Sequence, residues 1–337
     1  MLTVLSGLKG EGFKGGGVRV LLTGATGFVG SAIVKSISDS SCHDLIVSSR
    51  QPDSSFDASI KNFVIGDINS DCNWRAALDG VDVVLHAAAR AHIMRDSASD
   101  PLIEFRRVNT AGTLHLARQA AEAGVRRFVF VSSIKVNGEA TSEKSPFTEE
   151  DPPSPQDPYG VSKLEAEQGL LALARETGME VVIVRPPLVY GPGVKANFRS
   201  MMSWLKRGIP LPLGSVHNKR SFVALDNLVD FVVTCMDHPR AANQVFLVSD
   251  GVDLSVTELL TGLANAMGQS VRLLPVPVGL LKAGASLLGK RDVSQRLLGS
   301  LQLDISKARE VLGWVPPVSV EDALKKTAAD FLANDQR

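Results

Sequence analysis

The chain has 337 residues, of which 44% are hydrophobic, and its 36 lysines and arginines equal its 36 aspartates and glutamates. This length predicts about two domains, a net charge of zero argues against a nucleic-acid surface, and no apolar run reaches the roughly 18–20 residues of a membrane span. Cys42, Cys72 and Cys235 have neither metal-like nor disulfide-like spacing, which predicts a reducing, cytoplasmic compartment and no metal site. At the N-terminus, the glycine-rich residues 1–17 predict a disordered extension.

Strands and helices are predicted to alternate through the first half of the chain. The apolar run 18–23 is typical of a strand buried on both faces, and a helix is expected at 28–38. Further strands are predicted at 44–49, 63–66, 81–88, 127–132 and 180–185, and further helices at 100–124 and 159–178. This alternation predicts an α/β fold of the Rossmann type, a doubly wound parallel sheet with helices on both faces.

The second half has a different character, which begins at the proline and glycine cluster Pro186-Pro-Leu-Val-Tyr-Gly-Pro-Gly193. Helices are expected at 197–208 and 253–268, the latter capped by Ser255 and Glu258, and a strand at 244–249 returns to the main sheet. Residues 273–289 predict a loop and a buried helix, with contact to a membrane surface as the alternative. We therefore expect a nucleotide-binding domain at 18–186 plus 221–250, and a smaller interleaved substrate-binding cap at 187–220 and 251–332.

The first predicted strand runs into a glycine turn, Thr23-Gly-Ala-Thr-Gly-Phe-Val-Gly30. Between a buried strand and a helix, three glycines at this spacing allow a tight turn, approach of the backbone to a pyrophosphate, and close packing of helix on strand. The helix N-terminus then presents free N–H groups to the phosphates. This pattern predicts a dinucleotide site with contacts from Gly24, Thr26, Gly27, Phe28, Val29 and Gly30.

The end of the second strand bears on which dinucleotide is bound. It reads Val47-Ser-Ser-Arg50, with no carboxylate at the tip to accept from the ribose hydroxyls of NAD. Arg50 can pair with a 2′-phosphate, helped by Ser48 or Ser49, which favours NADP over NAD. The alternative for Arg50 is an ordinary solvent-facing side chain. Asp67, followed by Ile68, is placed to accept from the adenine amino group.

Two side chains of the predicted helix 159–178 suggest the chemistry. Tyr159 and Lys163 are four residues apart and therefore share one helical face. An ammonium beside a phenol favours the phenolate, so we expect the pKa of Tyr159 to lie below its usual value of about 10. Ser133, at the end of the strand 127–132, completes a set of three polar groups.

Together these motifs resemble the extended short-chain dehydrogenase/reductase family, in its nucleotide-sugar epimerase, dehydratase and reductase branch, over residues 18 to about 332. The resemblance rests on the glycine turn, Gly66-Asp67, His86-Ala-Ala-Ala89, Asn109, Ser132-Ser133, Tyr159 with Lys163, Arg185-Pro-x-x-Val-Tyr-Gly-Pro-Gly193 and the tail 303–314. It implies that Tyr159 is the acid and base, Lys163 tunes it and holds the nicotinamide ribose, and Ser133 positions the sugar oxygen. It also implies cofactor contacts from Ala87, Ala88, Ala89, Asn109 and Pro186, and a homodimer formed through helices 100–124 and 159–178.

Within that family the residues after Ser133 exclude a dehydratase. Related 4,6-dehydratases carry an Asp-Glu pair there, whereas this chain has Ile134 and Lys135. Two activities on a UDP-sugar remain. Because Arg50 favours NADP, we expect reduction of the C4 ketone of a UDP-4-keto-6-deoxy-N-acetylhexosamine in bacterial surface-polysaccharide synthesis. The alternative is a 4-epimerase with tightly bound NAD, and a non-catalytic NADP sensor is a third possibility.

The resemblance also assigns residues to the substrate. The expected contacts are Ser133, Lys135, Asn197, Leu213 and Arg220, with Arg220 on the diphosphate and Leu213 beside the uracil. The alternative for Lys135 is a surface lysine. Arg291 or Arg296 is a candidate for a second diphosphate contact, and Arg90 and His92 are candidates to face the sugar.

Overall fold

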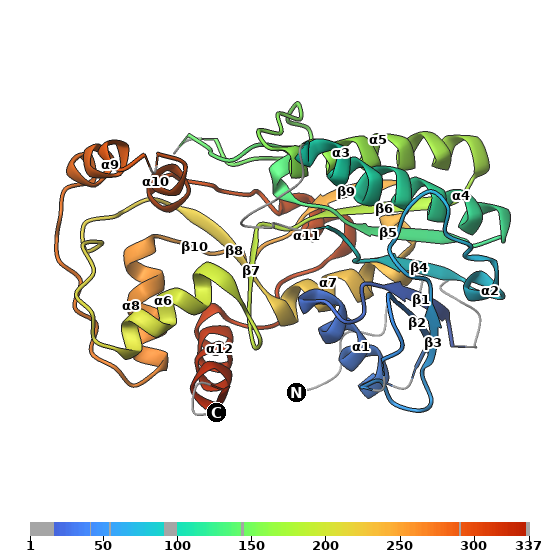
Figure 1. The fold of residues 1–337 in the computed structure, drawn as a ribbon, viewed down its shortest axis with the longest axis horizontal. Helices are drawn as coiled ribbons and strands as arrows, with labels where there is room; N and C mark the ends of the chain where they lie inside the picture. The colour runs from blue at the N-terminus through green and yellow to red at the C-terminus, as the bar shows by residue number, and fades with distance from the viewer. Residues whose placement is uncertain are drawn as a thin grey trace.

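A computed structural model of the protein describes residues 17–40, 42–53, 55–90, 100–142, 145–289 and 291–334. Its largest unit is a parallel seven-stranded sheet with the strand order β3-β2-β1-β4-β5-β6-β9 (Figure 1). The strands are β1 (Arg19–Thr23), β2 (Asp44–Ser49), β3 (Lys61–Val64), β4 (Val83–His86), β5 (Arg127–Val131), β6 (Glu180–Arg185) and β9 (Gln244–Leu247). The order 3-2-1-4-5-6 is that of a Rossmann fold, so the predicted fold class is confirmed. All but residue 17 of the predicted extension lies outside the described residues.

The central strand β1 shows why this sheet is covered on both faces. Val20, Leu21 and Leu22 are all fully buried. Val20 and Leu22 belong to one hydrophobic cluster and Leu21 to another. Because successive side chains of a strand point to opposite faces, an unbroken apolar run needs a core on each side.

Helices supply both cores (Figure 1). The cluster with Val20 contains residues of α1 (Phe28–Ser40), α7 (Leu225–Asp237) and α11 (Ser306–Leu312). The cluster with Leu21 contains residues of α2 (Arg75–Leu78), α4 (Thr113–Glu122) and α5 (Pro158–Thr177). The predicted helix 100–124 is divided into α3 (Pro101–Phe105), a π-helix η1 (Arg106–Gly112) and α4.

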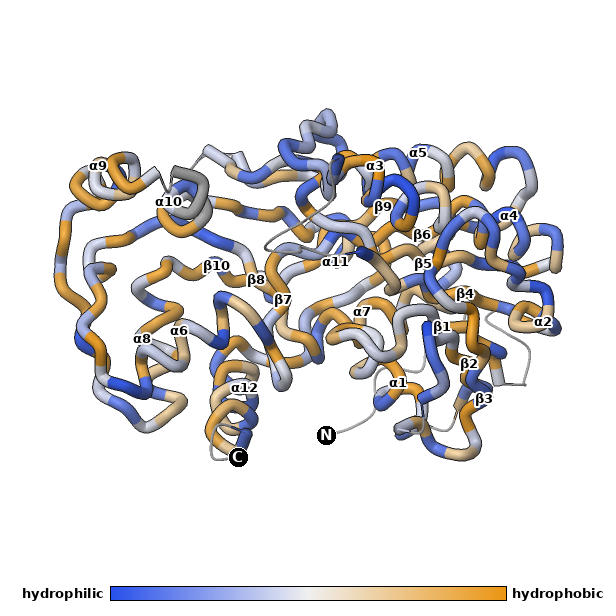
Figure 2. The backbone as a smooth tube through the Cα atoms, viewed as in Figure 1, coloured by the Kyte–Doolittle hydropathy of each residue, from blue (hydrophilic) through white to orange (hydrophobic). Residues whose placement is uncertain are grey.

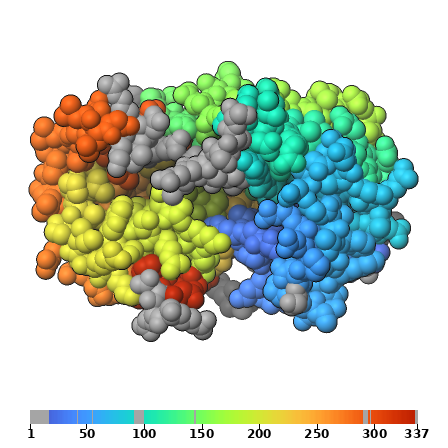
Figure 3. All heavy atoms as spheres, in the orientation of Figure 1, coloured from blue at the N-terminus to red at the C-terminus, as the bar shows by residue number. Residues whose placement is uncertain are grey.

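The second half of the chain builds a separate hydrophobic core. A small sheet, β10 (Asp253–Leu254), β8 (Arg220–Ala224) and β7 (Leu188–Tyr190), lies with the helices α6 (Ala196–Lys206), α8 (Val256–Ala266) and α12 (Val320–Asn334). Phe198, Leu260 and Phe331 meet in this core. Hydrophobic residues in Figure 2 lie where these helices and strands face one another. The space-filling view is hollowed between the yellow segment of this unit and the blue N-terminal segment of the large sheet (Figure 3).

Several predicted elements differ from those observed. The third strand was predicted at 63–66 and lies at Lys61–Val64, while the helix predicted at 253–268 starts at Val256, because Asp253 and Leu254 form β10. Ser255 and Glu258 do form the predicted capping box. The strand β8 was not predicted. The remaining short elements are η2 (Ile134–Val136), η3 (Pro239–Ala241), α9 (Val278–Leu287) and α10 (Arg291–Leu298).

The helix expected to be buried within 273–289 is instead exposed. It corresponds to α9, in which no residue is buried, and Leu280 is 66% exposed. The prediction rested on the long apolar run of this segment, but α9 lies at the outer edge of the second unit beside α10 (Figure 1), where the partly buried Val278 and Leu281 pack against the core of that unit. None of the described helices combines the length and the apolar character that crossing a membrane requires.

Candidate active site

The glycine turn packs too closely for any side chain at two positions. Gly24 has φ +75°, and a Cβ there would lie 2.7 Å from the backbone nitrogen of Ala88. A Cβ at Gly30 would lie 2.0 Å from the carbonyl oxygen of Gly24. The turn therefore sits directly between β4 and the start of α1. Thr26 and Gly27 are left exposed at the helix N-terminus, where N–H groups and the helix dipole favour an anion.

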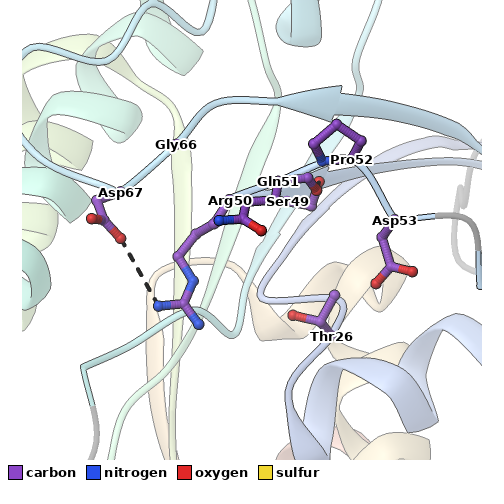
Figure 4. A pocket seen from close by; sticks show the side chains of 8 residues that line it. All are labelled: Thr26, Ser49, Arg50, Gln51, Pro52, Asp53, Gly66 and Asp67. Carbon is purple, nitrogen blue, oxygen red and sulfur yellow. Dashed lines mark hydrogen bonds and ion pairs between the residues drawn. The ribbon is translucent and has the colours of Figure 1, made fainter.

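A cavity of about 650 Å³ adjoins this turn (Figure 4). It is lined by Thr26, Ser49, Arg50, Gln51, Pro52, Asp53, Gly66 and Asp67. These residues come from the start of α1 and from the carboxyl ends of β2 and β3, the edge at which parallel sheets bind nucleotides. The turn and the cavity together fit a dinucleotide, with Phe28 and Val29 packed against the core beneath.

Arg50 and Asp67 are not independent groups in this cavity. Arg50 Nη1 lies 3.9 Å from Asp67 Oδ1, and the two side chains are 78% and 69% exposed (Figure 4). The Ser49 hydroxyl donates to the Gln51 carbonyl oxygen at 2.6 Å. Ile68 packs against the π-helix η1, since a Cβ on Gly112 would lie 2.7 Å from it. A 2′-phosphate would therefore compete with Asp67 for Arg50.

The tip of β2 carries no carboxylate, but the turn after it brings one to the cavity. Asp53 lines the cavity on the side opposite Asp67, near Thr26 (Figure 4). Hydrogen bonds from the Ser55 hydroxyl and backbone N–H lower the pKa of Asp53, so it is a carboxylate at neutral pH. Asp53 was overlooked because it follows the strand by four residues and reaches the cavity only through the turn at Gln51 and Pro52.

Tyr159 and Lys163 lie on the first two turns of α5, whose N-terminus is capped by Asp157. Lys163 is 1% exposed, and its ammonium donates to the Val131 carbonyl oxygen at 2.8 Å. It lies 4.3 Å from the centre of the Phe130 ring and 6.0 Å from that of Tyr159. The Tyr159 ring packs edge-on against Phe105 at 6.0 Å. The tyrosine and lysine thus meet at the carboxyl end of β5.

Ser133 lies two residues after the end of β5, between Val131 and Lys135, which both contact α5 or its N-terminal cap. Val131 accepts the Lys163 hydrogen bond on one side, and Lys135 pairs with Asp157 on the other. The Ser133 hydroxyl accepts from the Lys135 backbone N–H at 3.3 Å. The structure therefore places Ser133 in a loop that is attached on both sides to the helix carrying Tyr159 and Lys163.

The pKa of Tyr159 moves in the direction opposite to the one expected. Burial raises it, and the Asp157 carboxylate raises it further. Burial also lowers the pKa of Lys163 to about 7, against the opposing effect of Glu167. Burial disfavours the charged forms of both groups. The attraction between the Lys163 ammonium and a Tyr159 phenolate is therefore smaller than the cost of removing the phenolate from water.

Asn109 connects the loop after β4 to α5. Its side chain is 1% exposed, accepts from Arg90 N–H at 2.8 Å, and donates to the Arg90 carbonyl at 3.1 Å and to Ser162 Oγ at 3.1 Å. Asn109 lies within the π-helix η1, a type of element frequent at functional sites. This arrangement suits the predicted role of orienting the backbone near Ala87, Ala88 and Ala89.

A buried network on α5 and the neighbouring strands, next to the predicted catalytic residues, was not predicted. Arg185 donates to both carboxylate oxygens of Glu167, at 2.5 to 3.2 Å, and to Asn137 Oδ1 at 2.9 Å. Ser132 Oγ donates to the same carboxylate. Glu167 and Arg185 are 2% and 5% exposed. Glu167 could have been recognised from its spacing, because it follows Lys163 by four residues and therefore shares its helical face.

The predicted substrate contacts are divided between the two units. Lys135 pairs with Asp157 and Glu139, while Arg220 donates to the Gly299 carbonyl at 2.9 Å. Burial lowers the pKa of Arg220, and the nearby Glu139 opposes this. Glu139 thus pairs with Lys135 at 3.4 Å and interacts electrostatically with Arg220.

The other predicted contacts are more dispersed. Asn197 is exposed on α6, Leu213 is 9% exposed in the core of the second unit, and the Pro186 carbonyl accepts from Ile134 N–H at 2.9 Å. His92 and the side chains of Arg291 and Arg296 lie outside the described part of the chain. Among the described residues, no group of three or more His, Cys, Asp or Glu side chains is arranged to hold a metal ion.

The Rossmann sheet, the glycine turn and the tyrosine and lysine on one helical face define a dinucleotide-dependent enzyme of the extended short-chain dehydrogenase/reductase type. The chain belongs to the NAD dependent epimerase/dehydratase family, whose sequence model matches residues 20–249.

Relatives within the family correct the predicted activity. The chain is 52% identical over 321 residues to a UDP-glucose 4-epimerase of Vibrio cholerae, covering 94% of this chain and 97% of that protein. It is 30% identical to a UDP-glucose 4-epimerase of Mycolicibacterium smegmatis, covering 95% and 100%. The crystal structure of UDP-glucose 4-epimerase from Thermotoga maritima with UDP-glucose superposes with a TM-score of 0.73 at 25% identity, covering 94% and 99%. The expected 4-ketone reductase is therefore wrong, and the epimerase alternative is the one these relatives support.

Proposed function

We propose that the protein interconverts UDP-sugars that differ in configuration at C4, with UDP-glucose and UDP-galactose as the first pair to test. The 52% identity to an epimerase over almost the whole chain carries this proposal. The site itself argues against dehydration, because Ile134 is 3% exposed within a hydrophobic cluster. An apolar, buried side chain cannot protonate a leaving hydroxyl, and the neighbouring Lys135 is occupied by two carboxylates.

The chain's own residues then have the following roles. Tyr159 takes the proton from the C4 hydroxyl and later returns it, and Ser133 donates a hydrogen bond to the same oxygen. The Lys163 ammonium, fixed by the Val131 carbonyl, stabilises the phenolate while it exists. NAD, when bound, supplies the group that accepts hydride from C4 and gives it back. The boundaries predicted for the nucleotide-binding domain and the cap, the homodimer and the cytoplasmic location remain predictions.

The proposed activity has a direct test. We expect the purified protein to convert UDP-galactose into UDP-glucose without added cofactor, because an epimerase returns its hydride and regenerates NAD in every turnover. The products can be separated by anion-exchange chromatography. The absence of interconversion in protein shown to contain stoichiometric NAD would refute the proposal.

We also propose that the cofactor is NAD and that Asp53 accepts from an adenosine ribose hydroxyl. Asp53 faces the cavity, whereas Arg50 is already close to Asp67. A carboxylate favours ribose hydroxyls and repels a 2′-phosphate.

Replacement of Asp53 by asparagine should therefore weaken NAD binding about tenfold, since a hydrogen bond to a charged group is lost. The preference for NAD over NADP should become smaller. The matched control is Arg50→Ala, which should leave the Kd for NAD nearly unchanged. Both constants can be measured by calorimetry. A selective loss of NADP binding in the arginine variant, with no effect of the aspartate variant, would reverse the assignment.

A further inference from the structure

The segment that carries Ser133 is attached to α5 on both sides of the serine. Before it, the Val131 carbonyl accepts from Lys163 at 2.8 Å and Ser132 Oγ donates to Glu167. After it, Lys135 Nζ binds Asp157 Oδ2. The placement of Ser133 relative to the helix that carries Tyr159 is therefore set by these flanking contacts.

The contact on the Lys135 side is built into the backbone as well. A Cβ on Gly160 would lie 2.9 Å from the Lys135 carbonyl oxygen, so the loop passes directly against the first turn of α5. Asp157 divides its two oxygens between the neighbours: Oδ1 accepts from Gly160 N–H at 2.7 Å, and Oδ2 faces the Lys135 ammonium. One carboxylate thus caps the helix and holds the loop.

Partial burial makes this pair more than a surface contact. The side chains of Lys135 and Asp157 are 27% and 17% exposed, and Glu139 adds a second carboxylate 3.4 Å from the ammonium. Charges shielded from water interact more strongly than exposed ones. Removal of the lysine would take away the cation that faces Asp157 Oδ2, two residues from Tyr159.

We propose that Lys135 is a positioning residue, whose ammonium holds Asp157 and so fixes the Ser133 loop against the first turn of the helix that carries Tyr159. This inference rests on the proposed epimerase function and gives Lys135 a role other than the substrate contact expected from the sequence. Lys135 acts on the reaction through Ser133, Tyr159 and Asp157.

The charged groups near Tyr159 make the consequence specific. On its own side, Asp157 precedes Tyr159 and Lys163 follows it on α5. Lys135, on η2, and Glu139, in the loop after η2, lie near Asp157. On the packed helices α3 and η1, Arg107 pairs with Glu104 at 3.1 Å and Arg106 with Glu165 at 2.6 Å. Arg90 stacks over the ring of Phe105, which itself packs against Tyr159. His86 is buried and neutral, because burial lowers its pKa to about 3. Of these groups, Lys135 is the cation bound to the carboxylate that raises the pKa of Tyr159.

Replacement of Lys135 by methionine should shift the rising limb of the kcat–pH profile upward by about one pH unit. Without the Lys135 ammonium the Asp157 carboxylate disfavours the phenolate more strongly, so below the limb kcat falls about tenfold, while KM changes little. Lys135→Arg keeps the charge and should retain the wild-type limb. Asp157→Asn keeps a helix cap but removes the charge, so it should move the limb downward, and the double variant Lys135→Met/Asp157→Asn should return it toward wild type.

A second readout needs no substrate. The chain has only two tyrosines, and the other, Tyr190, is 1% exposed and donates to Asp250 at 2.9 Å, with its pKa strongly raised by burial. Because burial raises the pKa of both tyrosines, the titration of Tyr159→Phe is subtracted, and the remaining absorbance change at 295 nm in NAD-loaded protein follows Tyr159 ionisation. Its midpoint should move in the same order among the variants. Tyr159→Phe provides the baseline.

The two readouts separate the possible outcomes. Shifts in the tyrosine titration without any epimerase activity in the wild-type protein would refute the proposed function and keep the positioning role. An increased KM in Lys135→Met, with both the pH limb and the titration unchanged, would overturn the positioning role and identify a substrate contact. Equal loss of activity in the methionine and arginine variants, without a shift, would also overturn it.

Discussion

Replacement of Tyr159 by phenylalanine is expected to lower kcat by about 10²- to 10⁴-fold, the usual contribution of a positioned acid and base. The ring contact with Phe105, at 6.0 Å between centroids, is kept, so folding and cofactor binding should be unaffected. Only the hydroxyl that exchanges the proton is lost. Steady-state kinetics with UDP-galactose, together with NAD content and thermal unfolding, measure this result.

Tyr190→Phe is the matched control. It removes the other tyrosine hydroxyl, which is buried and donates to Asp250 in the core of the second unit. This variant should lose stability, because Asp250 loses a hydrogen-bond donor, but it should keep kcat. If Tyr159→Phe retained more than about a tenth of the wild-type kcat, the assignment of Tyr159 as the acid and base would be wrong.

Replacement of Glu167 by alanine is expected to lower the free energy of unfolding by about 3–5 kcal/mol. The change leaves the Arg185 guanidinium, whose side chain is 6% exposed, without its carboxylate, and it also removes the partner of Ser132. A buried charge without a counterion is costly, since neither water nor protein replaces its lost hydration. Urea denaturation followed by circular dichroism gives the value.

Two further variants test the reason for that loss. Glu167→Met/Arg185→Met removes both charges and should recover much of the stability, because apolar side chains of similar size can replace a buried pair. Lys325→Met breaks an exposed pair with Glu321 on α12, whose side chains are 57% and 78% exposed, and should have no measurable effect. A double variant as unstable as Glu167→Ala would show that lost packing, not the unpaired charge, causes the loss.

The strands predicted most accurately are those buried on both faces of the sheet, because their apolar stretch is continuous. The strands predicted at 44–49 and 180–185 have the same bounds as β2 and β6. In both strands every residue but the first is buried, and each has an unbroken apolar stretch at its centre, residues 45–47 in β2 and 181–184 in β6. The edge strand β3 has no buried residue, and its predicted position was displaced by two residues. The strand β8 was missed because it lies in the small sheet, outside the alternating pattern.

The function could be predicted only as far as the family. Tyr159, Lys163, Ser133 and the glycine turn are recognisable because each depends on residues close together in the chain. The choice of a reductase rested on the family resemblance and on Arg50, and the structure shows why Arg50 was an insufficient guide. Arg50 lies near Asp67 from the next strand, and Asp53 faces the same cavity. Neither contact follows from the three residues at the strand tip.

By itself, the sequence determined the Rossmann fold, the glycine turn and the placement of Tyr159 and Lys163 on one helical face, because strand burial, turn geometry and helical spacing are local properties of the chain. Only the tertiary structure decided the electrostatics of that pair. Burial raises the pKa of Tyr159, Glu167 opposes the effect of burial on Lys163, and Asp157 joins Lys135 to the helix. These effects depend on how much water the fold excludes and on which distant charges it brings together, and neither quantity is encoded in residue spacing.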